Sequence, residues 1–315
     1  MKEKVTIIGA GSWGTTLATL LVQKQHPVDI WTHSPQHLPE TPARVLASMA
    51  AAVENSSVLI IAVASQFYRQ TLTALRPLLK DTPYLLSATK GLEMDTGKRM
   101  AEVMAEVLPD HRKHMAVLSG PNLSREIADQ KPAASVIASE DASTADFFQA
   151  LLSTPLFRLY TNPDVIGVEL GGTLKNAIAI AAGAADGFNL GNNAKAGLMV
   201  RGIAETTRLG VALGAQASTF SGLSGMGDLI ATCSSPLSRN YQVGMALAAG
   251  ETRAEIEHRM TEVAEGISTA RVAADLAQKK NVEVPIIQQV YEVLYLQKNP
   301  YDAIYTLMTR DLKKE

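Results

Sequence analysis

The chain has 315 residues, of which 46% are hydrophobic and 19% are charged, so it is long enough for about two domains and too apolar for an intrinsically disordered protein. The 29 Lys and Arg residues nearly balance the 31 Asp and Glu residues, and a formal net charge of −2 excludes the strongly positive surface that binds nucleic acid or an anionic membrane. The single cysteine, Cys233, excludes an internal disulfide bond and a cysteine-rich zinc site.

The sequence begins with Met-Lys-Glu-Lys and then runs into an apolar segment at Val5. This start lacks the apolar run and the small-residue cleavage site of a signal peptide. No uninterrupted apolar stretch approaches the roughly eighteen residues of a membrane-spanning helix. We therefore expect a soluble cytoplasmic protein with no membrane insertion.

The first half of the chain alternates short apolar runs with amphipathic segments. Runs of about four to six apolar residues are typical of strands that are covered on both faces. The predicted strands are Val5–Gly9, Val28–Thr32, Val58–Val63, Tyr84–Ala88, Met115–Ser119, Ala134–Ala138 and Phe157–Tyr160. The predicted helices between them are Thr15–Lys24, Gln66–Leu79, Gly97–Leu108 and Ala142–Ser153. This order predicts a Rossmann-like α/β domain over residues 1–162, with a doubly wound, mostly parallel sheet.

The pattern changes after Asn162 and Pro163, where the sequence becomes rich in alanine and contains no convincing strand. The predicted helices of this half are Asp164–Ala185, Lys195–Leu213, Arg239–Ala249, Arg253–Arg259, Ser268–Lys279, Pro285–Leu296 and Pro300–Thr309. Glycine and asparagine residues separate several of them. We therefore expect a second, all-helical domain over residues 163–315.

A G-x-G-x-x-G motif occupies residues 9–14, after the first predicted strand and at the start of a helix. Gly9 permits the tight turn, Gly11 lets the backbone approach a pyrophosphate, and Gly14 lets the helix pack closely on the strand. The N–H groups of the first helical turn then face the phosphates. This context favours dinucleotide binding over a merely flexible turn. Trp13 is not needed for the turn, so it either borders the cofactor or belongs to the hydrophobic core.

The end of the second predicted strand bears on the choice between NAD and NADP. An acidic residue there hydrogen-bonds the ribose 2′-hydroxyl and repels a 2′-phosphate. Asp29 lies within the strand, where we expect a structural role, and the strand ends without an acidic residue. His33 and Ser34 can donate hydrogen bonds to a 2′-phosphate, but no arginine stands beside them. NADPH is therefore permitted, and the preference between the two cofactors stays open.

Lys175 lies in a predicted helix that is rich in small and apolar residues. Close approach of other backbone to such a helix removes water from the ammonium group. Desolvation disfavours the charged form of an amine and makes a lysine a usable proton donor or acceptor near neutral pH. The alternative is a lysine whose long side chain reaches the surface.

An anion site is predicted at Ser238-Arg239-Asn240, where a helix begins. Ser238 suits the N-cap position, but a cation in the first turn opposes the helix dipole. A bound anion would resolve this conflict, with Arg239, Asn240 and the first N–H groups as donors. Asp228 follows two glycines and has three possible roles: balancing the charge of Lys175, binding a substrate hydroxyl, or capping a turn.

Two further candidates follow predicted strands of the first half. Ligands of open α/β sheets bind beyond the carboxyl ends of the strands, which places Lys90 and Gly120 beside a ligand. His111 and His114 lie in a polar segment and are expected to be solvated. The histidines show no spacing typical of metal ligands, so we predict no metal site.

Together these motifs resemble bacterial NAD(P)-dependent glycerol-3-phosphate dehydrogenases across nearly the whole chain. The resemblance is carried, in this order, by the segments at residues 9–15, 89–91, 119–121, 169–176, 225–229 and 238–240. It implies reversible hydride transfer between NAD(P)H and dihydroxyacetone phosphate, which gives sn-glycerol 3-phosphate for phospholipid synthesis. The expected partner is therefore a small phosphorylated substrate, and we expect no binding of nucleic acid.

The resemblance also implies roles for individual residues. Lys175 would accept the proton in the oxidation direction. Substrate contacts would come from Lys90, Gly120, Asn122, Asp228, Ser238, Arg239 and Asn240. Cofactor contacts would come from Gly9, Gly11, Ser12, Trp13, Gly14, His33, Lys90, Ser124, Arg239, Val263 and Glu265.

The sequence departs from the family pattern in three places. Ser34 stands where the family usually has a basic residue, and the region from Ser34 to Asn55 is shortened. Asn122 stands where the family usually has Ser or Thr, and Ser124 stands where it usually has Ala.

Two other functions suit the same pattern. A 3-hydroxyacid or 6-phosphogluconate-type dehydrogenase, whose C-terminal domain is also all-helical, would recognise a carboxylate. A non-catalytic dinucleotide-sensing module would bind the cofactor without turnover. In each case the alanine-rich helical domain is compatible with a homodimer.

Overall fold

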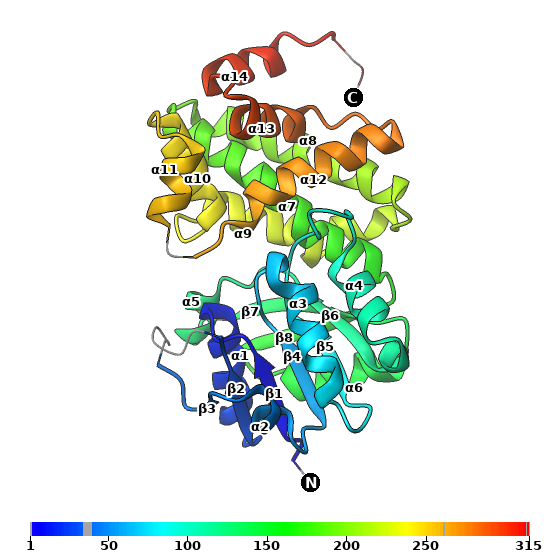
Figure 1. Cartoon of the computed structure of the whole chain (residues 1–315). Helices are drawn as coiled ribbons and strands as arrows, with labels where there is room; N and C mark the ends of the chain where they lie inside the picture. The colour runs from blue at the N-terminus through cyan, green and yellow to red at the C-terminus, as the bar shows by residue number, and fades with distance from the viewer. Residues whose placement is uncertain (1, 34–39, 261, 313, 315) are drawn as a thin grey trace. The chain divides into compact units, whose positions relative to one another are not determined.

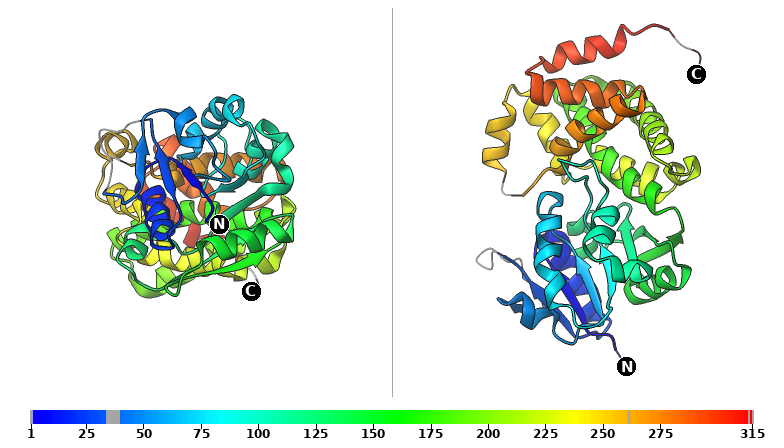
Figure 2. Two further views of the ribbon diagram at one scale, coloured as in Figure 1. Left: turned by 90° about the horizontal axis from the view of Figure 1, so that it is seen from below. Right: turned by 45° about the vertical axis from the view of Figure 1, so that its right-hand side comes forward.

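A computed structural model describes residues 2–33, 40–260, 262–312 and 314 of the chain. The chain forms two compact units, Met1–Glu169 and Leu170–Glu315 (Figure 1). Figure 2 shows the same ribbon from two further directions, with the sheet in the first unit and helices in the second. The last strand ends at Asn162, and helix α7 (Val165–Gly187) then runs from the first unit into the second.

An eight-stranded sheet forms the centre of the first unit, in the order β3-β2-β1-β4-β5-β6-β7-β8. Neighbouring strands are parallel, except that β6 and β7 are antiparallel. The strands are β1 (Val5–Ile8), β2 (Val28–Trp31), β3 (Arg44–Leu46), β4 (Val58–Ile61), β5 (Tyr84–Ser87), β6 (Met115–Ser119), β7 (Ala133–Ala138) and β8 (Phe157–Asn162). The predicted doubly wound, mostly parallel sheet is confirmed. Its winding reverses between β1 and β4, which is where such folds bind dinucleotides.

Helices cover both faces of this sheet. They are α1 (Ser12–Gln23), α2 (Met49–Val53), α3 (Ser65–Leu75), α4 (Met100–Val107), α5 (Ser124–Ala128) and α6 (Ala142–Leu152), with short 3-10 turns at Arg76–Leu78 and Pro109–His114. The four predicted helices are present as α1, α3, α4 and α6, with ends that differ by a few residues. The short α2 and α5 were not predicted.

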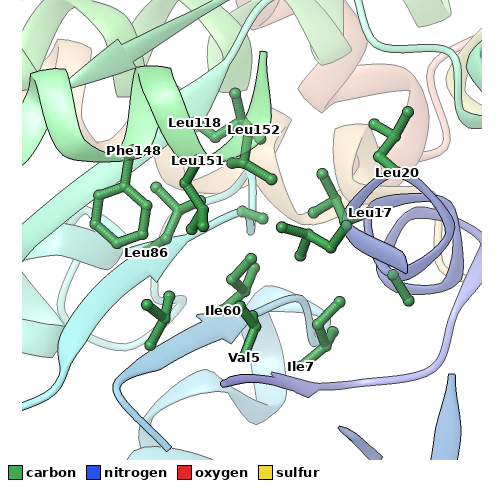
Figure 3. Packing of buried hydrophobic residues seen from close by; sticks show 14 of the residues in the cluster. Val5, Ile7, Leu17, Leu20, Ile60, Leu86, Leu118, Phe148, Leu151 and Leu152 are labelled. Carbon is green, nitrogen blue, oxygen red and sulfur yellow. The ribbon is translucent and has the colours of Figure 1, made fainter. Parts of the chain in front are cut away.

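Alternate side chains of the strands enter two separate cores. Figure 3 shows Ile7 and Ile60 packing with Leu17 of α1 and Phe148 of α6 in the first core. Neighbouring residues of the same strands, such as Ile8, point into the second core with α3 and α4. Strands such as β1 and β4 are buried on both faces and are therefore continuous apolar runs, which is why the sequence predicted them. The short, partly exposed β3 was not predicted.

The regular elements described in the second unit are all helical. They are α7, α8 (Gly191–Ala212), α9 (Asp228–Ser234), α10 (Arg239–Ala248), α11 (Arg253–Arg259), α12 (Glu265–Lys280), α13 (Pro285–Leu296) and α14 (Pro300–Met308), with a 3-10 turn at Ala217–Ser221 and a π turn at Leu223–Gly227. The predicted helices are present. α9 was not predicted, because its glycine-rich approach suggested a loop.

Helix α7 is long and apolar enough to cross a membrane by length and composition alone, but 83% of the relevant window is buried inside the protein. It is therefore a core helix. Its first turns belong to the first unit, where the Glu169 carboxylate accepts hydrogen bonds from the Arg99 guanidinium (2.5 Å) and the Ala101 N–H (2.8 Å).

The expectation that His111 and His114 are solvated is wrong for His111, which is 7% exposed. The turn Pro109–His114 packs between α4 and β5 and thereby covers His111. His114 is partly buried, and its ring stacks on Tyr84 with 4.8 Å between ring centroids. Within the described residues, no group of three or more His, Cys, Asp or Glu side chains is placed to hold a metal ion.

Candidate active site

The glycine-rich loop joins β1 to α1, and each of its three glycines occupies a different environment. Gly9 has φ of +114°, and a Cβ there would collide with the backbone of Ala62. A Cβ at Gly14 would collide with the Gly9 carbonyl oxygen, whereas a Cβ at Gly11 would have no atom within 4 Å. The first turn of α1 contains no acidic residue. The loop therefore leaves open space at the positive end of a helix, as a pyrophosphate requires.

Trp13 packs against the core of the first unit. Its ring makes an edge contact with Phe157, with 6.3 Å between centroids. Its Nε1 is buried and has no hydrogen-bond partner among the described residues. The structure thus shows the core contact, and a cofactor contact remains a prediction.

The end of β2 contains no acidic residue that is available to a ribose. Asp29 is buried within β2, where its carboxylate accepts two hydrogen bonds of 2.8 Å from Arg44 and lies 3.2 Å from Lys4. The hydrogen bonds from Arg44 outweigh burial and lower the pKa of Asp29. The predicted structural role of Asp29 is confirmed. His33 is exposed beyond the end of the strand, and Ser34 lies outside the described residues.

Three predicted residues converge near the ends of β5 and β6. The Lys90 ammonium group donates to the Gly120 carbonyl oxygen (3.0 Å) and to Asn122 Oδ1 (2.7 Å). Gly120 has φ of +140° and lies against Ser135. The sequence predicts a substrate contact for Asn122, and the structure shows that its side-chain oxygen accepts a hydrogen bond from Lys90.

Ser124 lies beside the glycine-rich loop. It is the first residue of α5, and its carbonyl oxygen accepts a hydrogen bond from Thr16 of α1 (3.3 Å). The start of α5 is therefore adjacent to the start of α1.

The second unit contains the predicted amine. Lys175 is 6% exposed, and its ammonium group lies 3.0 Å from Asp228 Oδ1 and donates to Thr232 Oγ1. Thr232 in turn donates to Asp228 Oδ1 (3.2 Å). Lys175 does not reach the surface, and Asp228 balances its charge. A buried ion pair needs such additional hydrogen bonds to offset its desolvation.

Helix α10 begins beside this ion pair. Ser238 accepts a hydrogen bond from the Tyr241 N–H (3.2 Å), as an N-cap residue does. Asn240 donates to Asn176 Oδ1 of α7 (2.9 Å) and accepts from the Gly266 N–H of α12 (2.8 Å). Because Asn176 follows Lys175, the helix that carries the amine is bonded directly to the first turn of α10.

Arg239 is half exposed at the start of α10. Its guanidinium group donates to the Val263 carbonyl oxygen (3.1 Å) and lies 3.3 Å from Glu262. A cation at the start of a helix is disfavoured by the helix dipole, and these two acceptors compensate for that unfavourable interaction. Glu265 is the first residue of α12 and is partly exposed. Arg239, Val263 and Glu265 therefore lie within two adjoining segments.

The structure thus gathers the predicted residues into two groups. The first unit holds Gly9, Gly11, Ser12, Trp13, Gly14, His33, Lys90, Gly120, Asn122 and Ser124. The second unit holds Lys175, Asp228, Ser238, Arg239, Asn240, Val263 and Glu265. Their roles toward substrate and cofactor remain predictions.

Two candidate functional residues were not predicted from the sequence. Thr232 lies one helical turn after Asp228, a spacing that would have identified it had α9 been predicted. Phe67 lies in the first turn of α3, after β4, and is 51% exposed. The sequence showed only an aromatic residue shortly after a predicted strand; its exposure and the position of that strand beside β1 come from the structure.

Cys233 is fully buried next to Thr232. Burial raises the pKa of its thiol to about 12. A thiol that stays protonated is a poor nucleophile, so Cys233 is not a candidate nucleophile.

Comparison with known proteins shows which family the chain is similar to over its whole length. The family model for the C-terminus of NAD-dependent glycerol-3-phosphate dehydrogenase matches residues 164–305, and the model for its N-terminus matches residues 4–44 and 37–145. Proteins named glycerol-3-phosphate dehydrogenase [NAD(P)+] from Geobacter sp. (strain M21) and Geobacter metallireducens are 44% and 46% identical over 333 residues, covering 100% of this chain and 99% of each relative. The crystal structure of glycerol-3-phosphate dehydrogenase from Coxiella burnetii superposes with a TM-score of 0.91 at 34% identity, covering 98% of this chain and 99% of that one.

Proposed function

The chain belongs to the NAD-dependent glycerol-3-phosphate dehydrogenase family, and from that premise we propose how its residues interconvert dihydroxyacetone phosphate and sn-glycerol 3-phosphate with NAD(P)H. The observation that carries the proposal is the buried Lys175 amine, held by Asp228 and Thr232 on a helix bonded directly to the start of α10. An amine that exchanges a proton and a helix start that binds a phosphate are the two groups this reaction needs from the second unit.

The first unit fits a dinucleotide. The space at Gly11 and the close packing at Gly9 and Gly14 form a cradle of backbone at the start of α1. We propose that this loop, with Ser12 and Trp13, binds the cofactor, and that further contacts come from His33, Lys90, Ser124, Arg239, Val263 and Glu265. When bound, the nicotinamide supplies or accepts the hydride.

Lys175 is the proposed proton donor in the reduction direction. Its Nζ gives a proton to the oxygen that becomes the C2 hydroxyl and takes it back during oxidation. Asp228 compensates the ammonium charge before the transfer, and Thr232 fixes the direction in which Nζ points. A general acid held in place contributes about 10²–10⁴ to a rate.

The start of α10 is the proposed phosphate site. Arg239, Asn240 and the N–H groups of the first turn are donors at the positive end of a helix. Ser238 contributes its own polar group there, in addition to its role as N-cap. Binding of this remote phosphate aligns the carbonyl group, so its energy raises the rate as well as the affinity.

In the first unit, Lys90 is proposed to contact both substrate and cofactor. Gly120 and Asn122 hold its ammonium group through two hydrogen bonds. A fixed positive charge stabilises the negative charge that develops on a reacting oxygen. We expect Asn122 to act by orienting Lys90.

The cofactor preference stays open in this proposal. Asp29 is engaged by Arg44 inside the strand, so it cannot select against a 2′-phosphate. The exposed His33 can donate to one. We therefore propose that both NADH and NADPH are accepted.

The experiment that tests this function follows NADH and NADPH oxidation with dihydroxyacetone phosphate. We expect turnover with this substrate and little with dihydroxyacetone. If 3-hydroxyisobutyrate or 6-phosphogluconate instead reduced NAD+ or NADP+, the carboxylate-specific alternative would be established. Cofactor binding without any turnover would establish a sensing module.

We also propose a cytoplasmic homodimer that supplies sn-glycerol 3-phosphate to phospholipid synthesis. The alanine-rich helices of the second unit offer a surface suited to close helix packing. Light scattering coupled to size exclusion measures the mass in solution, and a monomeric mass would refute the dimer.

A further inference from the structure

A second ion pair lies between helices α7, α8 and α10 of the helical unit. The Lys195 ammonium group donates to Asp186 Oδ2 (2.6 Å), and the Tyr241 hydroxyl donates to the same oxygen (2.6 Å). The ammonium group also lies 5.3 Å from the centroid of the Tyr241 ring. We call Asp186, Lys195 and Tyr241 the Asp186 cluster.

Asp186 is poorly placed to stabilise its own helix. It lies in the last turn of α7, where the helix dipole disfavours a negative charge. Burial alone would raise the pKa of Asp186, but the hydrogen bonds from Lys195 and Tyr241 lower it. Burial and the Asp186 carboxylate together raise the pKa of Tyr241 to about 12, so its hydroxyl stays a donor. The carboxylate therefore serves the contact between helices.

That contact fixes α10 on α7 at close range. A Cβ at Gly183 of α7 would collide with the Tyr241 carbonyl oxygen, and a Cβ at Gly244 of α10 would collide with the Ile180 carbonyl oxygen. Two backbones that approach this closely cannot slide without losing contacts. The Asp186–Tyr241 hydrogen bond lies at one end of this crossing, and the Asn176–Asn240 bond lies near Lys175.

Tyr241 also lies inside the first turn of α10. It follows Asn240 directly, and its N–H is the group that Ser238 caps. The ends of helices fray more readily than their centres, so a phosphate site in a first turn needs fixing from outside. The Asp186 cluster and the bond to Asn176 supply two such attachments to α7.

We propose that Asp186, Lys195 and Tyr241 are positioning residues, which hold the first turn of α10 on α7 and so set the distance between the Lys175 amine and the phosphate-binding groups of Arg239 and Asn240. This inference rests on the proposed function. The cluster does not touch the substrate; it determines how effectively phosphate binding aligns the reacting carbonyl.

The test compares dihydroxyacetone phosphate with dihydroxyacetone in the Tyr241→Phe and Asp186→Asn variants. Misplacement of a positioning group by about 1 Å costs up to about 10² in rate. We expect kcat/KM for the phosphorylated substrate to fall about tenfold, and that for dihydroxyacetone to fall less than about twofold. Because both variants break the same hydrogen bond, the double variant falls little further than either one.

The chain offers matched controls for both changes. Glu292→Gln breaks the Lys298–Glu292 ion pair (2.9 Å), which is about as buried as the Lys195–Asp186 pair but involves no residue of α7 or α10. Tyr68→Phe removes a buried hydroxyl that donates to Met104 Sδ (3.6 Å) in the first unit. We expect both controls to retain the wild-type ratio of kcat/KM between the two substrates. Equal losses with both substrates, or the same change of ratio in the controls, would overturn the inference.

A readout besides activity separates this inference from the proposed function. Inorganic phosphate is expected to raise the Tm of the wild-type protein, and to raise it less in Tyr241→Phe and Asp186→Asn. If dihydroxyacetone phosphate is not turned over but these phosphate shifts are seen, the proposed function fails and the positioning role stands. Undiminished phosphate shifts in both variants, or no shift in the wild type, would refute the positioning role.

Discussion

In the first unit, the candidate cofactor loop is made of backbone: a side chain at Gly9 or Gly14 would collide with neighbouring backbone, and Gly11 faces open space. In the second unit, the candidate catalytic groups are buried side chains that neutralise and orient one another, such as Lys175 with Asp228. A backbone cradle tolerates changes of side chain but no added bulk. In a buried ion pair, removing one charge alone is strongly destabilising, because the other charge stays buried without its partner. The two regions are therefore expected to fail in different ways.

The largest effect is expected for Lys175→Ala. Loss of the proton donor should lower kcat by about 10²–10⁴, while NADH affinity, to which Lys175 is not proposed to contribute, stays close to that of the wild type. Steady-state kinetics and fluorescence titration of NADH measure the two quantities. Wild-type turnover in this variant would remove lysine from the mechanism.

Lys175→Ala also leaves the Asp228 carboxylate buried without its partner, which typically costs about 3–5 kcal/mol. The double variant Lys175→Met/Asp228→Asn removes both charges and should recover much of that stability, but not the activity. Denaturation curves of the single and double variants separate loss of chemistry from loss of folding. A stable double variant with wild-type kcat would contradict the assigned role.

A second effect concerns pH, because the pKa values of two buried acids, Asp29 and Glu205, are shifted in opposite directions. In the first unit, Arg44 lowers the pKa of Asp29. In the second, Glu205 of α8 accepts hydrogen bonds from the N–H groups of Ile286 (2.9 and 3.0 Å) and Ile287 (3.3 Å) at the start of α13. Burial nevertheless raises the pKa of Glu205 to about 7.

Between pH ~4.5 and ~7, Glu205 therefore holds a proton in the folded chain and has lost it in the unfolded chain. The folded state binds more protons, so its contribution to stability is fully present below pH ~4.5 and is lost as pH rises through about 7. The loss is on the order of 3 kcal/mol. Glu205→Gln should flatten this part of the stability curve, measured by chemical denaturation from pH 5 to 8. An unchanged slope would show that Glu205 is ionised throughout.

A third effect tests the phosphate site. Arg239→Ala removes a half-exposed charge at the start of α10, and losing a hydrogen bond to a charged group costs about 1.5–3 kcal/mol. We expect KM for dihydroxyacetone phosphate to rise about 10- to 100-fold, with Tm nearly unchanged. An unaltered response to this substrate would refute phosphate recognition by Arg239.

The same contrast explains what the sequence could reveal. Strands such as β4 were predictable because burial on both faces leaves a continuous apolar run, whereas β3 is short and partly exposed and gives no such signal. The glycine-rich loop was recognisable because its function lies in local spacing. The Asn176–Asn240 bond joins residues far apart in the chain, so no local pattern indicates it. His111 was misjudged because its polar neighbours hid the packing that covers it.

The smallest effect is expected for Gly11→Ala, which tests the backbone loop of the first unit directly. Gly11→Ala adds a methyl group into open space, and the φ of −70° at Gly11 suits alanine, so the fold should be as stable as the wild type. The methyl group nevertheless occupies the place where the backbone would approach a pyrophosphate. We expect the Kd for NADH to rise about tenfold, which corresponds to about 1.4 kcal/mol.

Gly197→Ala in α8 is the matched control, because a Cβ there also meets no atom within 4 Å. It should leave NADH affinity unchanged and raise Tm slightly, since alanine favours helices. Calorimetry of NADH binding and thermal denaturation of both variants complete the comparison. If Gly11→Ala bound NADH as tightly as Gly197→Ala, the open space at Gly11 would have no part in binding the cofactor, and the backbone cradle would have to be sought elsewhere in the first unit.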